Sequence, residues 1–247
     1  MEPTEYDNLA RLEGRHWWYA GMREIASQVL HSVSLHPSLQ ILDAGCGVGG
    51  GLEWLAAYGE TSGIDLNPLA VGYAARISQR VAQASVQQLP FPADAFDLVT
   101  SFDVLYHLAV TNDEAALREC ARVLRPGGLL LVRVPAYNWL RGTHDRQVHT
   151  RHRYDGHELR QKIERAGLTV FRLTHAGLTI LPMALLLRLA QSFRSDMTAR
   201  SDVAMPPEAL NRMLTGMLAA EGVWLRRFDS SFGLSLLALA GKPYRGR

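Results

Sequence analysis

Residues 41–52 of this chain are ILDAGCGVGGGL. The apolar residues before the glycines predict a buried strand, and LEWLAAYG at residues 52–59 predicts a helix after them. Glycines at such a strand-to-helix turn let backbone amides approach a ligand closely, because no Cβ atom stands in the way. The spacing of Gly45, Gly47 and Gly50 also fits the dinucleotide-binding fingerprint, so the glycines alone do not identify the ligand.

Asp43 favours one class of ligand over the other. It lies just before the first glycine of the turn, and its carboxylate is expected to face the head of the ligand. A pyrophosphate there would meet a like charge, whereas the ammonium and sulfonium groups of S-adenosylmethionine (SAM) would meet an opposite charge. The stretch therefore predicts a SAM site; the alternative is a glycine turn in an ordinary α/β loop.

The second acidic position is Asp65, at the end of TSGIDL, which predicts the next strand. The carboxyl edge of a parallel sheet is where such folds bind ligands, and a carboxylate there can accept hydrogen bonds from both hydroxyls of a ribose. The alternative role is to cap the following helix, but Asn67 and Pro68 already supply that signal.

The composition favours one elaborated domain. The chain has 247 residues, 47% of them hydrophobic and 20% charged, which suits a single globular core. A net charge of +2 is too small to predict nucleic-acid binding. Two cysteines make no disulfide framework and the polar N-terminus shows no signal peptide, so the cytoplasm is the expected location.

Strands and helices alternate along the rest of the chain. Further strands are expected at residues 81–86, 96–102, 129–135 and 168–178, with helices at 112–124 and 156–166. This alternation predicts an α/β fold with a parallel sheet.

Four motifs in this order carry a family resemblance: DAGCGVG at residues 43–49, GIDL at 63–66, LPFPADAFDLV at 89–99 and VLRPGGLLLV at 123–132. Together they resemble class I SAM-dependent methyltransferases over about residues 39–135. The resemblance implies a Rossmann-like, seven-stranded, mostly parallel sheet with helices on both faces. It also implies an antiparallel last strand near residues 232–242.

The resemblance also implies the cofactor residues. The glycine turn would line the methionine end of SAM, Asp65 would hold the ribose, and residues 85–86 would edge the adenine. Ser85 stands where many relatives carry an acidic residue, and a hydroxyl accepts a weaker hydrogen bond than a carboxylate. The expected set is Asp43, Gly45, Gly47, Gly49, Asp65, Leu66, Ser85, Val86 and Phe102.

Acceptor chemistry is expected from histidines near the same edge. His107 follows the strand at 96–102 and is the first candidate for a general base, with a helix-start histidine bonded to backbone as the alternative. His144, oriented by Asp145, is the second candidate. No spacing of the histidines matches a strong metal-ligand pattern, so no metal is expected.

A basic segment should select the acceptor. Residues 141–165 carry seven Arg or Lys, four Asp or Glu and four of the nine histidines. This segment would bind an anionic group through arginine forks, or it is a solvated loop. The expected acceptor-binding residues are Tyr19, Tyr106, His149, Arg151, Arg153 and Tyr154.

HWWY at residues 16–19, together with PAYNWLRGTHD and HTRHRY, resembles bacterial methyltransferases of surface-glycan and secondary-metabolite pathways. This looser resemblance implies an oxygen acceptor on a sugar, with the arginines suited to the phosphates of a lipid diphosphate carrier. The two tryptophans are expected either to cover a pocket or to clamp a helix onto the sheet.

The expected organisation is a helical N-terminal lid at residues 1–38, a SAM-binding core at 39–177 and 228–247, and a helical cap insertion at 178–227. The apolar run at 178–193 is too short to span a bilayer, which leaves peripheral membrane contact or packing over the pocket. Three functions stay open: O-methylation of a small-molecule or glycan acceptor, N- or C-methylation, and SAM binding without catalysis. Monomer and homodimer are both compatible with the sequence.

Overall fold

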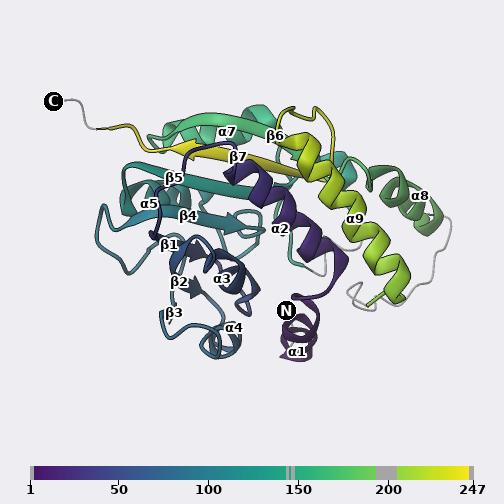
Figure 1. The fold of residues 1–247 in the computed structure, drawn as a ribbon, viewed down its shortest axis with the longest axis horizontal. Helices are drawn as coiled ribbons and strands as arrows, with labels where there is room; N and C mark the ends of the chain where they lie inside the picture. Colours follow the sequence, from purple (N-terminus) through teal and green to yellow (C-terminus); the bar gives the residue numbers. More distant parts are fainter. Residues whose placement is uncertain (1–2, 143–144, 146–147, 193–204, 245–247) are drawn as a thin grey trace.

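The computed structural model describes residues 3–142, 145, 148–192 and 205–244. Its centre is a seven-stranded sheet in the order β3-β2-β1-β4-β5-β7-β6, in which β7 runs antiparallel to both of its neighbours (Figure 1). The remaining pairs are parallel, which confirms the fold expected from the sequence. The strands are β1 Leu39–Ala44, β2 Gly59–Asp65, β3 Val81–Gln83, β4 Phe96–Phe102, β5 Leu124–Pro135, β6 Thr169–Ala176 and β7 Ser235–Gly241.

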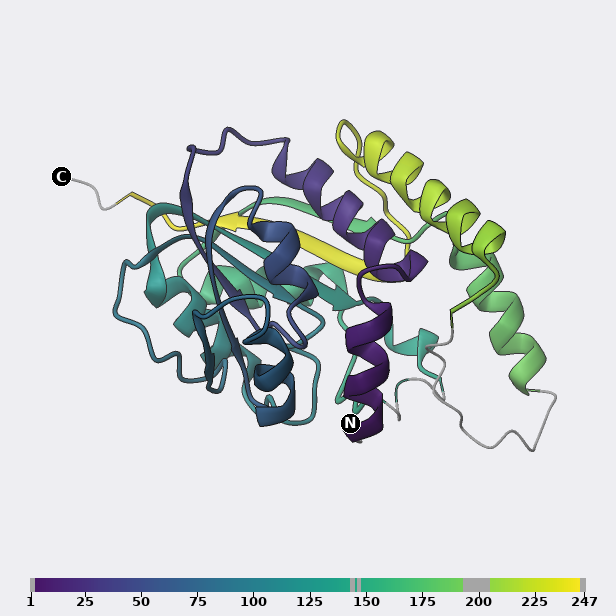
Figure 2. The same ribbon diagram turned by 60° about the horizontal axis from the view of Figure 1, so that its bottom comes forward.

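Helices cover both faces of the sheet (Figure 1, Figure 2). On one face, α5 and α7 pack on the sheet through residues such as Leu117 and Ile163. On the other face lie α2 and α9, which contribute Ile25 and Leu218. The helices are α1 Pro3–Leu12, α2 Trp17–Leu30, α3 Gly50–Leu55, α4 Pro68–Ala74, α5 Asp113–Val123, the short 3-10 helix η1 Asn138–Leu140, α7 Gly156–Arg165, α8 Leu181–Ser192 and α9 Glu208–Leu225.

The strand order places a topological switch point between β1 and β4. Asp43 near the end of β1 is in register with Thr100 of β4. The chain continues from β1 to β2 on one side, whereas β4 and β5 extend the sheet on the other side. Ligands of open α/β sheets bind at such a switch point, outside the carboxyl ends of the strands.

Helix α9 packs along α2 on the face of the sheet. A Cβ atom on Gly21 would lie 2.5 Å from the Leu218 side chain, so only glycine permits this close approach. In the first turn of α9, the Asn211 side chain accepts a hydrogen bond of 2.8 Å from the backbone N–H of Trp17, the first residue of α2. Helix α9 buries Leu214, Leu218 and Leu225 in the same core as α2, and the cap insertion at residues 178–227 stays a prediction.

Trp17 and Trp18 pack against the same core as α2, with their rings edge to face at 5.7 Å. Of the two roles expected for the tryptophans, this packing matches the clamp that holds a helix on the sheet. The expected lid at residues 1–38 accordingly includes a helix, α2, that belongs to the layer covering the sheet.

Strand β3 ends at Gln83, three residues earlier than expected. It is an edge strand whose side chains are half-buried or exposed, so little apolar burial extends it. Beyond it, Ser85 and Gln88 form an isolated antiparallel bridge. Within the described residues, no helix is long and apolar enough to cross a membrane.

Candidate functional site

The glycine turn after β1 adopts a backbone that requires glycine. Gly45, Gly47 and Gly49 have φ angles of +96°, +54° and +100°, a region that side chains disfavour. A Cβ atom on Gly45 would lie 2.2 Å from Val104, whereas the space beside Gly47 is open. The backbone N–H of Gly45 and that of Cys46 donate to the Ile64 carbonyl, which holds the turn against β2. The open space at Gly47 suits the close approach of a ligand.

Asp65 joins the glycine turn to the start of α4. Its Oδ2 accepts a hydrogen bond of 3.0 Å from the Gly47 N–H, and its Oδ1 accepts one of 2.8 Å from the Asn67 N–H. The cap of α4 is Asn67, whose side chain accepts from the Leu69 N–H. Leu66, next to Asp65, is half exposed. The structure therefore brings Asp65 beside the turn, and its role in binding the ribose stays a prediction.

Asp43 lies beneath the turn and is 3% exposed. Thr100 Oγ1 donates to its Oδ1 at 2.8 Å, and its Oδ2 faces Gly51, where a Cβ atom would lie 2.5 Å away. Burial raises the pKa of Asp43 to about 7. The expectation that this carboxylate faces the ligand is corrected, because β4 and the start of α3 enclose it.

The three remaining expected cofactor residues lie at the ends of β3 and β4. Ser85 Oγ accepts a hydrogen bond of 3.2 Å from the Gln87 N–H, and Val86 is buried in the core. Phe102 ends β4 and packs against the core that contains α2, with the Arg133 guanidinium 5.2 Å from its ring centroid.

The N-terminal segment also reaches the turn. Glu13, after α1, accepts a hydrogen bond of 3.2 Å on Oε2 from the Gly50 N–H, and Tyr6 packs with Val48 and Ala70. Burial raises the pKa of Glu13, and the Arg23 charge opposes that shift. The sequence does not single out Glu13, because a single Glu in a polar segment carries no pattern.

Residues 106–108 and residues 149–151 meet at the carboxyl edge of the sheet, where the acceptor is expected; this edge is called the acceptor edge below. The Leu108 N–H donates to the His149 carbonyl at 2.9 Å, and the Arg151 N–H donates to the Tyr106 carbonyl at 2.7 Å. This pairing places the rings of His107 and His149 edge to face at 5.7 Å. His149 is exposed, and its role in binding the acceptor stays a prediction.

The hydrogen bonding of His107 defines its protonation. Its Nδ1 accepts a hydrogen bond of 3.0 Å from the Ala109 N–H. A backbone N–H only donates, so a neutral ring carries its proton on Nε2. Burial, and then the neighbouring His149, lower the pKa of His107, which favours the neutral ring. His107 therefore offers a donor at Nε2 in this structure, and the general-base role expected from the sequence would require the other tautomer.

Arg153 and Asp145 form a buried ion pair. The Nε–Oδ1 distance is 2.7 Å and the Nη2–Oδ2 distance is 3.2 Å, and Arg153 also donates to the Ala136 carbonyl. Both residues are at most 6% exposed. This pair corrects two expectations, since neither Arg153 nor Asp145 is accessible to an acceptor. His144, the histidine that Asp145 was expected to orient, lies outside the described residues.

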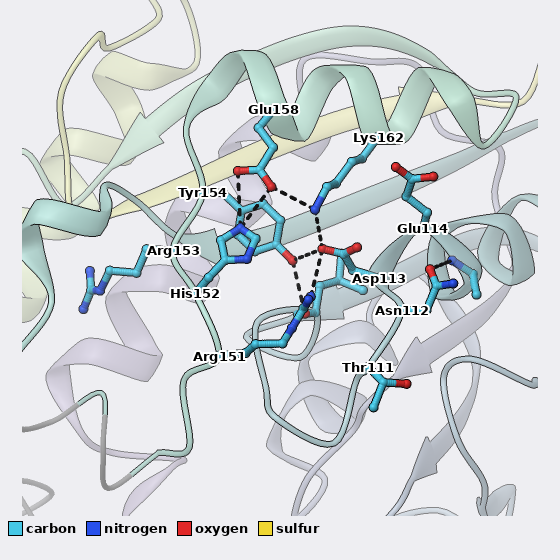
Figure 3. A network of polar contacts seen from close by, with 12 residues as sticks. Thr111, Asn112, Asp113, Glu114, Arg151, His152, Arg153, Tyr154, Glu158 and Lys162 are labelled. Carbon is cyan, nitrogen blue, oxygen red and sulfur yellow. Dashed lines mark hydrogen bonds and ion pairs between the residues drawn. The ribbon is translucent and has the colours of Figure 1, made fainter.

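Asp113 anchors a second internal network (Figure 3). Its Oδ2 accepts from the Tyr154 hydroxyl at 2.6 Å, from Lys162 Nζ at 2.7 Å and from Arg151 Nη2 at 3.1 Å. Burial pushes the pKa of Asp113 upward, but the hydrogen bonds from Lys162 and Tyr154 hold it below its ordinary value. Tyr154 is 1% exposed, so it is a core residue and not the acceptor ligand expected from the sequence.

A different pair of charges stands at the end of β4. Asp103, with a φ angle of +59°, binds the buried Arg133 of β5 at 2.5 Å. Burial raises the pKa values of both Tyr19 and Tyr106, with Glu13 and then Asp103 adding to the shift at Tyr19 and Asp103 adding to it at Tyr106, so both are neutral phenols. The one sequence feature that indicates this ion pair is Arg133, the single charged residue in the apolar run LLLVRVP.

Comparisons with known proteins agree with this geometry. Residues 42–132 match the methyltransferase domain family. A sterol 24-C-methyltransferase of Gibberella zeae is 29% identical over 120 residues, covering 44% of this chain and 30% of that protein. The ubiquinone biosynthesis O-methyltransferase of Azoarcus is 32% identical over 144 residues, covering 51% and 60%. This chain thus spans less than two thirds of the length of either relative.

Among solved structures, the phosphoethanolamine N-methyltransferase 2 of Haemonchus contortus in complex with SAM has a similar fold. Its TM-score is 0.56 at 16% identity, over 89% of this chain and 52% of that chain. The three similar proteins are named for carbon, oxygen and nitrogen acceptors, so similarity alone does not define the acceptor atom.

Proposed function

We propose that this chain is a class I SAM-dependent methyltransferase, and that it methylates an oxygen of a sugar, a glycolipid precursor or another small hydroxylated metabolite. The family uses SAM, and the residues of the glycine turn fit that cofactor. The positive φ angles leave room at Gly47, and Asp65 supplies the carboxylate for the ribose.

One observation carries the choice of oxygen. The acceptor edge offers a hydrogen-bond donor, Nε2–H of His107, and a partly exposed carboxylate, Asp103. A hydroxyl group both accepts and donates, so it matches the two side chains, whereas an ammonium group only donates. Arg151 and Arg153, the expected phosphate ligands, are engaged in internal ion pairs, which favours a hydroxylated group over an anionic one.

When bound, SAM supplies an electrophilic methyl group on a sulfonium. The chain then has to align the acceptor oxygen in line with that group and exclude water. Tyr19 and Tyr106, both partly buried and neutral, would form the walls of the acceptor site. His107 would orient the hydroxyl through Nε2–H.

The test is transfer of label from methyl-labelled SAM to a fraction of sugars, glycolipid precursors and hydroxylated metabolites. We expect a labelled product whose methyl group is on oxygen, identified by mass spectrometry of the fragmented product. Label on nitrogen or carbon would replace the proposed acceptor atom. SAM binding by calorimetry without label transfer to any fraction would favour a binding protein without catalysis.

A further inference from the structure

Asp103 has a backbone conformation that few side chains adopt. It directly follows β4, beside the end of β1 where the glycine turn begins, and its φ angle is +59°. Aspartate and asparagine tolerate this left-handed region better than most residues, and strained positions of this kind gather at functional sites. The Asp103 N–H donates to the Arg133 carbonyl at 3.0 Å, which holds the conformation.

The side chain of Asp103 is oriented by one neighbour. Arg133, 6% exposed on β5, donates to Asp103 Oδ2 from Nη2 at 2.5 Å and from Nε at 3.1 Å. Both bonds use Oδ2, and in the part of the chain that the structure describes Oδ1 accepts none. The Asp103 side chain is 30% exposed. The carboxylate is therefore fixed through one oxygen while its other oxygen is available to a ligand.

Three of the described side chains near this edge, those of His107, Tyr19 and Tyr106, offer no available basic atom, whereas His149 is exposed and lies against the His107 ring. The Nδ1 lone pair of His107 is used by the Ala109 N–H. Tyr19 and Tyr106 are neutral phenols, because burial raises the pKa of each.

The acidic groups nearby are engaged as well. Asp145 and Asp113 are held in internal ion pairs, and Asp43 is enclosed beneath the turn. Glu13 binds the Gly50 N–H at the cofactor end. Among the described residues discussed for this edge, Asp103 is the one with a free acceptor oxygen.

We infer that Asp103 is the catalytic residue that binds the acceptor hydroxyl and takes its proton, and that Arg133 positions it. The acceptor oxygen forms a bond to the methyl carbon, and the methyl–sulfur bond breaks with its electron pair remaining on sulfur. The hydroxyl proton passes to Oδ1 of Asp103. This inference rests on the proposed function, because it requires a hydroxyl acceptor.

The first test is Asp103→Asn, which keeps the shape and the backbone tolerance but removes the basic oxygen. Label transfer from methyl-labelled SAM to the acceptor fraction should fall by about 10²-fold or more. Calorimetry with SAM alone should change by less than about twofold, because the substitution removes an interaction with the acceptor.

Asp94→Asn is the matched control. Asp94 also has a left-handed φ angle, +58°, and forms a 2.7 Å ion pair with a cation, Lys242. Its side chain is 32% exposed, close to the 30% of Asp103, but it precedes β4 at the opposite edge of the sheet. Loss of an ion pair at a strained aspartate is thus common to both variants, and we expect label transfer to fall only in Asp103→Asn.

Chemical rescue separates proton transfer from structure. Asp103→Gly fits the left-handed backbone without strain and leaves space for a small carboxylate. Added sodium formate should restore part of the label transfer in Asp103→Gly and none in Asp103→Asn. A merely structural role would not respond to formate.

Two results would overturn the inference, and they differ. Undiminished label transfer by Asp103→Asn, with an active wild type, would exclude Asp103 and leave the proposed function standing. A wild type that binds SAM but labels no fraction would overturn the proposed function and this inference together.

Discussion

The Tyr154 hydroxyl donates a hydrogen bond of 2.6 Å to the Asp113 carboxylate, across 41 residues of sequence. Tyr154 belongs to the basic segment after β5, and Asp113 begins α5. Lys162 of α7 binds the same carboxylate oxygen (Figure 3). The basic segment is therefore fastened to α5, in part by Arg151 and Tyr154, which the sequence assigns to a ligand.

Asp113→Ala should destabilise the folded chain by about 3–5 kcal/mol, because it leaves a buried hydroxyl and two cations without their shared partner. Denaturant unfolding followed by circular dichroism measures this loss. Glu114→Ala is the control, because the neighbouring Glu114 makes ion pairs with Arg118 and Arg165 at the surface. We expect it to cost less than about 1 kcal/mol. Equal losses in both variants would contradict the structural role of Asp113.

Asp65→Ala should weaken SAM binding by about 10–100-fold, because one or two hydrogen bonds to a charged group are lost. The variant also frees the Gly47 N–H that Asp65 holds in the turn. Titration calorimetry with SAM gives the change directly. Glu60→Ala is the matched control, since Glu60 lies on the same strand but pairs at the surface with Arg80. Unchanged affinity in Asp65→Ala would remove Asp65 from the cofactor site.

The positions of the turn residues and of Asp65 were predictable from sequence because their signal is local. Gly45, Gly47 and Asp65 lie in a strand-turn-helix-strand segment whose spacing already defines their positions. The mostly parallel sheet followed from the same alternation, and its antiparallel last strand followed from the family resemblance.

The acceptor end was not predictable, because the role of each polar residue there depends on a distant partner. In the sequence, Arg153 and Tyr154 resemble ligand-binding residues. In the structure, Arg153 pairs with Asp145 and Tyr154 donates to Asp113, both in the interior. In the sequence, Asp103 is only the residue that follows a strand. Its ion pair with Arg133, 30 residues later, is visible only in the structure. Helix α9 shows the same limit, because its position along α2 depends on the close approach at Gly21.

The stability of the SAM-free protein should fall as the pH rises through about 7, because of Asp43. Burial raises the pKa of Asp43 to about 7 in the folded state, from an ordinary value of 3.8. The folded state thus binds more protons than the unfolded state between these values, so stability falls as pH rises. From about pH 6 to pH 8 the loss is about 1.4 kcal/mol.

Asp43→Asn should remove this pH dependence, since an amide has no charge to bury. Denaturant unfolding of both proteins at several pH values between about 6 and 8 tests the expectation. The difference in unfolding free energy between Asp43→Asn and the wild type should move in favour of the variant as the pH rises. A parallel pH dependence in the two proteins would assign the titration to another group.

His107 is expected to act as a hydrogen-bond donor, which two substitutions distinguish from a general base. His107→Gln keeps an N–H donor but has no basic nitrogen, whereas His107→Leu has neither. We expect label transfer by His107→Gln to stay within about tenfold of the wild type. Label transfer by His107→Leu should be slower still, by the rate factor that corresponds to the loss of one hydrogen bond. A general base would make both variants equally inactive, by about 10²-fold or more. SAM affinity, measured by calorimetry, should be unchanged in both, since His107 lies at the acceptor edge beside His149.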